Sequence, residues 1–296
     1  YNIPVTISAG KTNLTGSATP HGGIVLSIEN LNDTQIILDV DSKEVSCSVG
    51  ITLEHLREEV LKLSKNKLYY PVDPTSRHDA YIGGTIACNA SGFMPGERGA
   101  TRYWINEIEL LLPNGLFLKA KRGQYISKNG FFKIKGYNET LPIPKYKRPN
   151  IKNASGPYSS ENGEIDFVDL IIGSEGIYGL IVSCKLKLEK KPKNYLELFL
   201  CLNNEEKAID FHDFLYDYFN GYMSEISALE YFGYNSQHYM KHRNFLFKNE
   251  SDVGIYIQIP IYEGSFDKKS KEWINLINQF DDSIDLDSVI VLNDPI

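Results

Sequence analysis

Short runs of alternating hydrophobic and polar residues dominate the first two thirds of the chain, a pattern typical of half-buried strands. This pattern predicts strands over residues 3–7, 24–28, 34–40, 105–112, 116–118 and 179–188. The helical period replaces it once, after Thr52, which is a suitable N-cap. The apolar positions of that helix recur on one face at Leu53, Leu56, Val60 and Leu63. Residues 71–102 and 119–164 are rich in Gly, Pro, Asn and other polar residues, which indicates long loops.

The pattern changes after the charged, proline-ended stretch 189–192, which we interpret as a domain boundary. The chain then predicts an order of strand, helix, strand, strand, helix and strand at 195–201, 205–219, 226–231, 253–259, 268–280 and 288–292. That order is typical of an open-faced α+β sandwich of the ferredoxin type. We therefore expect an α+β protein of two domains, residues 1–190 and 191–296.

Charge excludes some classes of partner. The 296 residues carry a formal net charge of −7, so general nucleic-acid binding is not expected, because phosphate binding favours a basic surface. Residues 193–296 hold 18 acidic and 8 basic residues, a net −10, which leaves +3 for residues 1–192. A positive first part fits an anionic ligand, and a solvated charged face explains it equally well. No apolar run approaches the roughly 20 residues that span a bilayer.

Four cysteines lie far apart at Cys47, Cys88, Cys184 and Cys201, without the spacing of metal ligands. We expect reduced thiols, a cytoplasmic protein or one held at a membrane surface through a partner, and no metal site. Because the chain begins at Tyr1 within a predicted strand, we interpret it as a fragment or a processed chain.

The glycine-containing loop after the first strand is a candidate anion site. The string Gly10–Lys11–Thr12 resembles part of a nucleotide P-loop, but Val5 stands where that motif requires its first glycine. Even so, Gly10 and Gly16 allow backbone N–H groups to converge on phosphate oxygens. The hydroxyl groups of this loop can add donors, at Thr12, Thr15 and Ser17.

Further glycine-rich and polar segments follow in a fixed order, at 14–26, 71–76, 82–92, 99–102, 112–115, 152–156 and 172–179. In order and spacing, this series resembles the FAD-linked oxidases of the vanillyl-alcohol oxidase/PCMH flavoprotein superfamily. The branch that it most resembles contains the glycolate oxidase D-subunit, D-lactate dehydrogenase and D-2-hydroxyglutarate dehydrogenase. The resemblance covers residues 3–188. It implies a PCMH-type FAD-binding domain, followed by a ferredoxin-like α+β cap domain for the substrate.

The resemblance also implies which residues bind FAD. The loop Ser8–Ser17 resembles the family's pyrophosphate loop, formed here by Ser8, Ala9, Gly10, Lys11, Thr12, Asn13, Leu14, Thr15, Gly16 and Ser17. Two segments resemble those along the ribityl chain and isoalloxazine, at Pro71, Asp73, Thr75, Ser76, Gly83, Gly84, Ala87, Asn89, Ala90, Ser91 and Gly92. The residues that resemble those closing over flavin and adenine are Thr101, Glu175, Gly176, Gly179 and Ile181. Small residues among these permit close contact with a flat ring.

Several departures from the family limit what the resemblance implies. Covalent members carry a histidine at the pyrophosphate loop, and this loop has none, while His21 lies beyond it. We therefore expect non-covalent FAD. A strand–helix–strand unit before the loop and a C-terminal His/Gly/Asp/Asn motif are both missing, so the catalytic residues are left unassigned. The segment at 228–232 resembles a family motif only weakly, and we assign no role to Glu230.

The expected function is an FAD-dependent 2-hydroxy-acid dehydrogenase, in which hydride passes from the substrate to flavin N5. Arg102 is a candidate for the substrate carboxylate, with a structural ion pair as the alternative. The electron acceptor is unassigned, and a partner subunit or a homodimer is expected. One alternative is a non-catalytic flavin-binding or assembly subunit that needs a partner chain. Another is an alkyl-glycerone-phosphate synthase-like enzyme, with phosphate bound by the basic run Lys133, Lys135, Lys145, Lys147 and Arg148.

Overall fold

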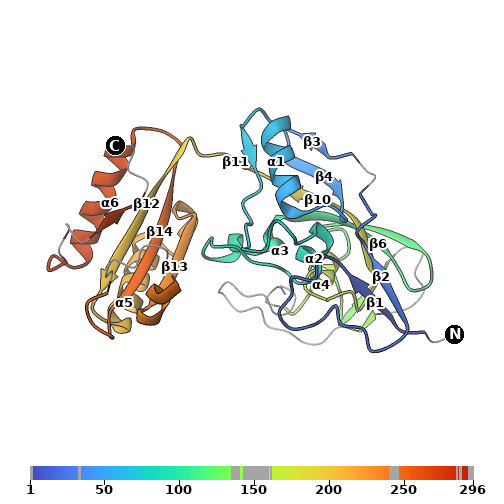
Figure 1. Ribbon diagram of the computed structural model, residues 1–296. Coiled ribbons are helices and arrows are strands. Elements are labelled where there is room, and N and C mark those ends of the chain that lie inside the picture. Colours follow the sequence, from blue (N-terminus) through green and yellow to red (C-terminus); the bar gives the residue numbers. More distant parts are fainter. Residues whose placement is uncertain are drawn as a thin grey trace. The chain divides into compact units, whose positions relative to one another are not determined.

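The computed structural model describes residues 3–32, 35–134, 141–142, 160, 162–239, 247–284, 286 and 289–292. Contacts divide the chain into two units, coloured by sequence in Figure 1. The first unit contains Tyr1–Gly92 and Glu97–Lys190. The second contains Phe93–Gly96 and Lys191–Ile296. Among the described residues, no helix combines the length and the apolar character needed to cross a bilayer.

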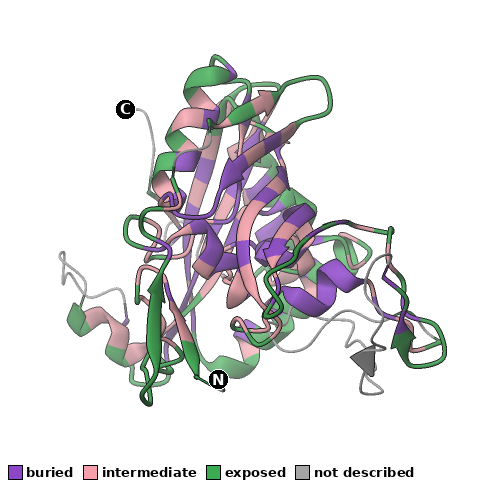
Figure 2. Ribbon diagram, turned by 90° about the vertical axis from the view of Figure 1, so that its right-hand side faces the viewer, coloured by how far each residue is buried: buried purple, intermediate pink, exposed green. Residues whose placement is uncertain are grey.

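The first unit is built on a five-stranded antiparallel sheet in the order β3-β4-β10-β6-β7. Its strands are β3 (Ile37–Asp39), β4 (Glu44–Ser48), β10 (Leu180–Lys187), β6 (Ile105–Leu111) and β7 (Phe117–Lys121). Helix α1 (Leu53–Leu63) begins at Thr52, whose hydroxyl accepts a hydrogen bond from the His55 N–H. The buried side chains of α1 join one core with those of the sheet, such as Val45 and Ile108. Figure 2 colours the buried parts of the chain purple.

Short elements complete this unit. Strands β1 (Val5–Ser8) and β2 (Ile24–Ser27) form a parallel pair, and all of β2 is exposed. Two further pairs join β5 (Leu68–Tyr69) with β11 (Glu189–Lys190), and β8 (Phe131–Phe132) with β9 (Leu141–Pro142). The short helices are α2 (Ile82–Ala87), η1 (Glu97–Gly99), α3 (Thr101–Trp104) and α4 (Phe167–Ile171).

The second unit has a four-stranded antiparallel sheet in the order β13-β14-β12-β15. Its elements follow along the chain as β12 (Asn194–Leu202), α5 (Glu205–Tyr218), η2 (Met223–Glu225), β13 (Ala228–Gly233), η3 (Tyr234–Tyr239), β14 (Val253–Ile261), α6 (Phe266–Phe280) and β15 (Ile290–Val291). The buried faces of α5 and α6 pack on alternate residues of β12 and β14 to form a second core. The expected ferredoxin-like strand and helix order is confirmed.

In the second unit the bounds of the expected strands and helices shift by up to two residues, and the short helices η2 and η3 were not expected. The larger differences fall in the first unit. Strand β4 was not predicted, because only Val45 and Cys47 are apolar in a short polar stretch, yet both are buried. The segment expected as a turn-bounded loop around Gly83 and Gly84 begins with helix α2. Tertiary packing overrides the low helix propensity of glycine there. Of the third predicted strand, 34–40, only Ile37–Asp39 forms a strand, and Thr34 lies outside the described residues.

Candidate functional site: a cavity of the first unit

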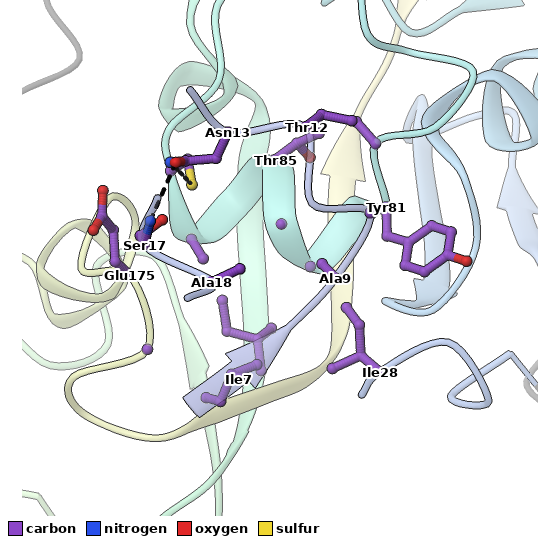
Figure 3. A pocket seen from close by; sticks show the side chains of 18 of the residues that line it. Ile7, Ala9, Thr12, Asn13, Ser17, Ala18, Ile28, Tyr81, Thr85 and Glu175 are labelled. Carbon is purple, nitrogen blue, oxygen red and sulfur yellow. Dashed lines mark hydrogen bonds between the residues drawn. The ribbon is translucent and has the colours of Figure 1, made fainter. Parts of the chain in front are cut away.

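Three segments of the first unit surround one cavity, which Figure 3 shows from close by. They are the end of β1 with the loop that follows it, the segment around α2, and the turn before β10. The empty space is about 1080 Å³ when the open solvent at the mouth is counted, and the cavity volume itself is about 210 Å³. Its wall consists mostly of small and uncharged residues, including Ala9, Gly83, Gly84, Ala87 and Ala90.

Close backbone packing fixes the path of the loop after β1. A Cβ atom on Gly10 would lie 1.9 Å from the carbonyl oxygen of Asp79, so no side chain fits at that position. Further along, the Asn13 carboxamide oxygen accepts hydrogen bonds from the Thr15 N–H at 2.9 Å and from the Ser17 N–H at 3.3 Å. This side chain therefore shapes the second half of the loop through local hydrogen bonds.

The two glycines of α2 are required by their neighbours. A Cβ atom on Gly83 would meet Ile28 Cδ1 at 2.8 Å and Val49 Cβ at 3.0 Å. A Cβ atom on Gly84 would lie 3.0 Å from the Cβ atom of Ala9 across the cavity wall. A larger residue at Gly84 would push α2 away from the β1 loop, and one at Gly83 would push it away from Ile28 and Val49, so the glycines keep these segments in close contact.

The turn before β10 is attached to the C-terminal end of α2 by backbone hydrogen bonds. The Gly173 N–H donates to the Ile86 carbonyl at 3.0 Å, and the Glu175 N–H donates to the Ala87 carbonyl at 2.9 Å. Glu175 and Gly176 have positive φ values of 53° and 84°. The Glu175 side chain is exposed and lines the cavity (Figure 3).

Cys88 is the thiol in the wall of this cavity, and Asn13 Nδ2 donates to its sulfur at 3.7 Å. Burial raises the pKa of Cys88, and the nearby Glu175 carboxylate acts in the same direction. The thiol is therefore less often ionised at neutral pH than a free cysteine, which makes it a weak nucleophile. His21 is exposed and does not line the cavity.

Arg102 lies inside the packing of the first unit, with a relative exposure of 1%. Its guanidinium donates to the carbonyl oxygens of Asp169 at 2.5 Å and Ile172 at 2.7 Å. The Asp169 carboxylate lies 3.6 Å from Arg102 Nη1 and 2.8 Å from Arg122 Nη1. Arg102 does not line the cavity and its guanidinium is engaged in the packing, which favours the structural ion pair, the alternative given above, over contact with a substrate carboxylate.

The structure brings much of the expected FAD-binding set together. The expected residues that line the cavity are Ala9, Gly10, Lys11, Thr12, Asn13, Ser17, Ser76, Gly83, Gly84, Ala87, Ala90, Glu175, Gly176, Gly179 and Ile181. The expected residues outside its wall are Ser8, Leu14, Thr15, Gly16, Pro71, Asp73, Thr75, Asn89, Ser91, Gly92 and Thr101.

Some residues outside the wall support it. Asn89 is fully buried and its side-chain oxygen accepts from the Arg102 N–H at 2.9 Å. Thr101 Oγ1 donates to the Ala90 carbonyl at 2.8 Å, which holds the end of the α2 segment. By contrast, the Leu14 side chain is fully exposed to solvent.

Sequence reasoning missed other lining residues: Ile7, Ala18, Ile28, Ala80, Tyr81, Thr85, Cys88, Ser174 and Leu180. Several are direct neighbours of expected positions, and Ile7 could have been found from strand alternation, because Ser8 points the opposite way and is buried. Ile28 lies in the cavity wall next to Gly83, and no local sequence pattern indicates that these two residues are neighbours.

A second cavity lies in the second unit, between α5 and β13. Its wall contains Glu230, to which no role was assigned, and Tyr231, whose hydroxyl donates to Glu205 Oε1 at 2.9 Å. Partial burial and this carboxylate raise the pKa of Tyr231. Of the basic run considered for phosphate, only Lys133 lies within the described residues. The described residues contain no group of His, Cys, Asp or Glu side chains arranged to hold a metal ion.

The first cavity fits FAD in its chemistry. Its wall has glycines and alanines where a flat ring needs close approach, and polar donors on the β1 loop where a diphosphate needs them. The side-chain hydroxyl and amide donors belong to Thr12, Asn13 and Ser17. The larger apolar side chains of the wall are Ile7, Ile28 and Ile181. Such an apolar cavity with a few placed polar groups is typical of a cofactor site.

Comparisons with known proteins agree with this fit. Residues 1–121 match the family model described as an FAD binding domain. The chain is 30% identical over 210 residues to a D-lactate dehydrogenase of Anaerostipes hadrus, covering 70% of this chain and 36% of that protein. It is 26% identical over 212 residues to the glycolate oxidase subunit GlcD of Bacillus subtilis, with the same coverages of 70% and 36%.

A D-2-hydroxyglutarate dehydrogenase of Xanthomonas citri is 30% identical over 191 residues, which cover 64% of this chain and 32% of that protein. The chain thus spans about a third of the length of these curated relatives. Among solved structures, an alkyldihydroxyacetonephosphate synthase superposes with a TM-score of 0.64 at 14% identity, covering 95% of this chain and 47% of that one. At this identity the likeness concerns the fold alone. Together these findings show an FAD-binding domain within residues 1–121 of the first unit, and they agree with the resemblance to the FAD-linked oxidases of the vanillyl-alcohol oxidase/PCMH superfamily.

Proposed function

We propose that this chain binds FAD in the cavity of its first unit and takes part in the oxidation of a small 2-hydroxy acid. The observation that carries the proposal is the cavity itself, whose wall joins the β1 loop, the α2 glycines and the turn at Glu175. Relatives named as dehydrogenases or oxidases of D-lactate, glycolate and D-2-hydroxyglutarate support the substrate class.

The chain's own residues would hold the cofactor in three ways. Backbone N–H groups of the loop at Gly10–Asn13, with the Thr12 and Ser17 hydroxyls, would donate to the diphosphate. The small residues of the α2 segment would let the ring lie against the backbone. Thr101 and Asn89 would keep that segment in place through the hydrogen bonds described above.

When bound, FAD supplies a two-electron acceptor, so a 2-hydroxy acid loses two electrons and two protons to become a 2-oxo acid. The base and the cation that would hold the substrate carboxylate are left unassigned in this chain. The substrate domain is proposed to be the second unit, residues 191–296, with the FAD-binding domain at 1–190. Two observations support non-covalent FAD. The thiol of Cys88 in the cavity wall is a weak nucleophile because its pKa is raised, and His21 lies outside the wall.

An anaerobic titration tests the proposal. The purified chain is loaded with FAD and mixed in turn with glycolate, D-lactate and D-2-hydroxyglutarate, while the visible flavin band is recorded. Bleaching by one of these acids, with the 2-oxo acid as product, is the expected result. A loaded chain whose flavin is reduced by dithionite but by none of the acids would contradict the proposed substrate class.

The same titration examines the role of a partner. GlcD is named as a subunit of glycolate oxidase, and we propose that this chain also works with a further subunit or a second copy of itself in the cytoplasm. Bleaching that occurs only when the FAD-loaded chain is in a larger assembly, separated by gel filtration, would support a non-catalytic or assembly role for the isolated chain.

A further inference from the structure

The cavity of the second unit has no part in the proposed binding of FAD. It lies between α5 and β13, which are both labelled in Figure 1, and all of its lining residues belong to the second unit. Its volume is about 370 Å³, which is within the range of small-molecule sites. Most of its wall is apolar and is formed by Ala208, Ile209, Phe211, Leu229 and Ile255.

The charges at this cavity are negative. Among the residues that the structure describes, its wall contains the carboxylates of Glu205 and Glu230 and no lysine or arginine. Lys207 is close in the sequence, but its ammonium group lies 2.7 Å from the Asp281 carboxylate, which compensates its charge. Residues 193–296 together carry a net charge of −10. Both the wall and the field of the whole unit therefore favour a cation over an anion.

Glu205 is well placed to receive such a cation. Its Oε1 atom accepts a hydrogen bond from the Tyr231 hydroxyl at 2.9 Å, which holds the carboxylate beside the tyrosine side chain. It forms no ion pair with any residue that the structure describes. His212 also lines the cavity, and its ring nitrogen already lies 3.0 Å from the Asp213 carboxylate. A carboxylate and an aromatic ring next to an apolar wall suit an organic cation, because the ring face attracts positive charge and the wall receives hydrocarbon.

We propose that this cavity binds a small organic amine in its protonated form, with the ammonium group at the two glutamates and the hydrocarbon part against the apolar wall. An aliphatic amine is protonated at neutral pH, as the side chain of lysine is. A neutral molecule of the same shape would gain only the apolar contact, and the carboxylates would repel an anion. The inference goes beyond the proposed function, because every residue involved lies outside the cavity of the first unit.

The experiment uses three probes with the same phenylethyl body, namely phenethylamine, phenethyl alcohol and hydrocinnamate, which end in an ammonium, a hydroxyl and a carboxylate group. NMR titration of the isotope-labelled full chain measures their dissociation constants at low and at high salt. Glu205→Gln removes one charge from the wall. Glu206→Gln is the matched control, because Glu206 is also exposed in the first turn of α5 but does not line the cavity. Ile209→Ser removes an exposed apolar side chain from the wall, and circular dichroism melts show that each variant is folded.

We expect phenethylamine to bind with a dissociation constant of about 1 mM, as is usual for a molecule of this size, and phenethyl alcohol to bind about fivefold more weakly. Hydrocinnamate should not bind measurably. At low salt Glu205→Gln should weaken binding of the amine about three- to fivefold and leave binding of the alcohol unchanged. This loss should shrink at high salt, because the carboxylate is exposed. Glu206→Gln should bind the amine like the wild type, and Ile209→Ser should weaken both the amine and the alcohol.

Equal affinity for the amine and the alcohol would overturn the inference, because the cavity would then be an apolar groove that does not select charge. Equal losses in Glu205→Gln and Glu206→Gln would overturn it too, since the charge would then act from outside the wall. Absence of saturable amine binding up to about 10 mM would exclude this class of ligand. These outcomes are distinct from failure of the proposed function: a chain that binds the amine but no FAD would contradict the proposed function and leave this inference intact.

Discussion

Adding one methyl group at Gly10 should weaken FAD binding strongly. In Gly10→Ala the new Cβ atom would lie 1.9 Å from the Asp79 carbonyl oxygen and 2.9 Å from its carbonyl carbon. The two backbone segments must then separate by about 1.5 Å to reach the 3.4 Å of ordinary contact. Overpacking of this kind costs about 1–3 kcal/mol. We expect a value near the upper end, because neither partner is a flexible side-chain terminus.

The displaced loop carries the donors proposed for the FAD diphosphate, so the cost should appear mainly in cofactor affinity. About 2–3 kcal/mol corresponds to binding about 30- to 150-fold weaker. Flavin fluorescence quenching measures the dissociation constant of FAD, and circular dichroism confirms that the variant is folded. Gly233→Ala is the matched control, because its Cβ atom would meet only Tyr231 at 3.7 Å, an ordinary contact. If Gly10→Ala binds FAD as tightly as Gly233→Ala, the contact between Gly10 and Asp79 does not position the cofactor loop.

Three further predictions concern single groups. Alkylation of Cys88 in the apoprotein should be slow at pH 7, because the pKa of its thiol is raised, and should speed up through and above pH 9. Bound FAD should block the alkylation, which peptide mass spectrometry would show. Labelling that FAD leaves unchanged would contradict the site. Arg102→Met should lower the free energy of unfolding by about 3 kcal/mol, measured by urea denaturation, because Asp169 loses its buried cationic partner and keeps only the partly exposed Arg122. A loss under about 0.5 kcal/mol would contradict the structural role. The hydrogen bond and ion pair with Lys207 lower the pKa of Asp281 to about 2. Asp281 should therefore stabilise the fold above about pH 4 and lose that contribution as pH falls through 2. Acid unfolding of Asp281→Asn should lack this part of the pH dependence.

The elements that the sequence predicts well are those whose pattern and end signals agree. Helix α1 begins at Thr52 and ends at Leu63 as expected, because the N-cap and the apolar face are both local features. The second unit is similar, since its strands and helices alternate with clear periods and cover each other in the order of the chain. Local preference and tertiary packing favour the same structure in these segments.

The sequence could not predict features that depend on contacts between distant segments. Helix α2 contains two glycines, which disfavour a helix locally and are required only because Ile28, Val49 and Ala9 press against them. The burial of Arg102 depends on the carbonyl groups of Asp169 and Ile172, nearly seventy residues away. A positive charge near a glycine-rich loop therefore suggested a ligand contact where the structure has an internal one.

We propose that the first unit binds FAD without a covalent bond. The most direct measurement is the visible absorption spectrum of the purified chain after incubation with FAD and gel filtration, repeated on the filtrate after denaturation. We expect a flavin band that travels with the folded chain and passes the filter once the chain is denatured. A folded chain that retains no flavin band would contradict FAD binding, and a band retained with the denatured chain would contradict its non-covalent character.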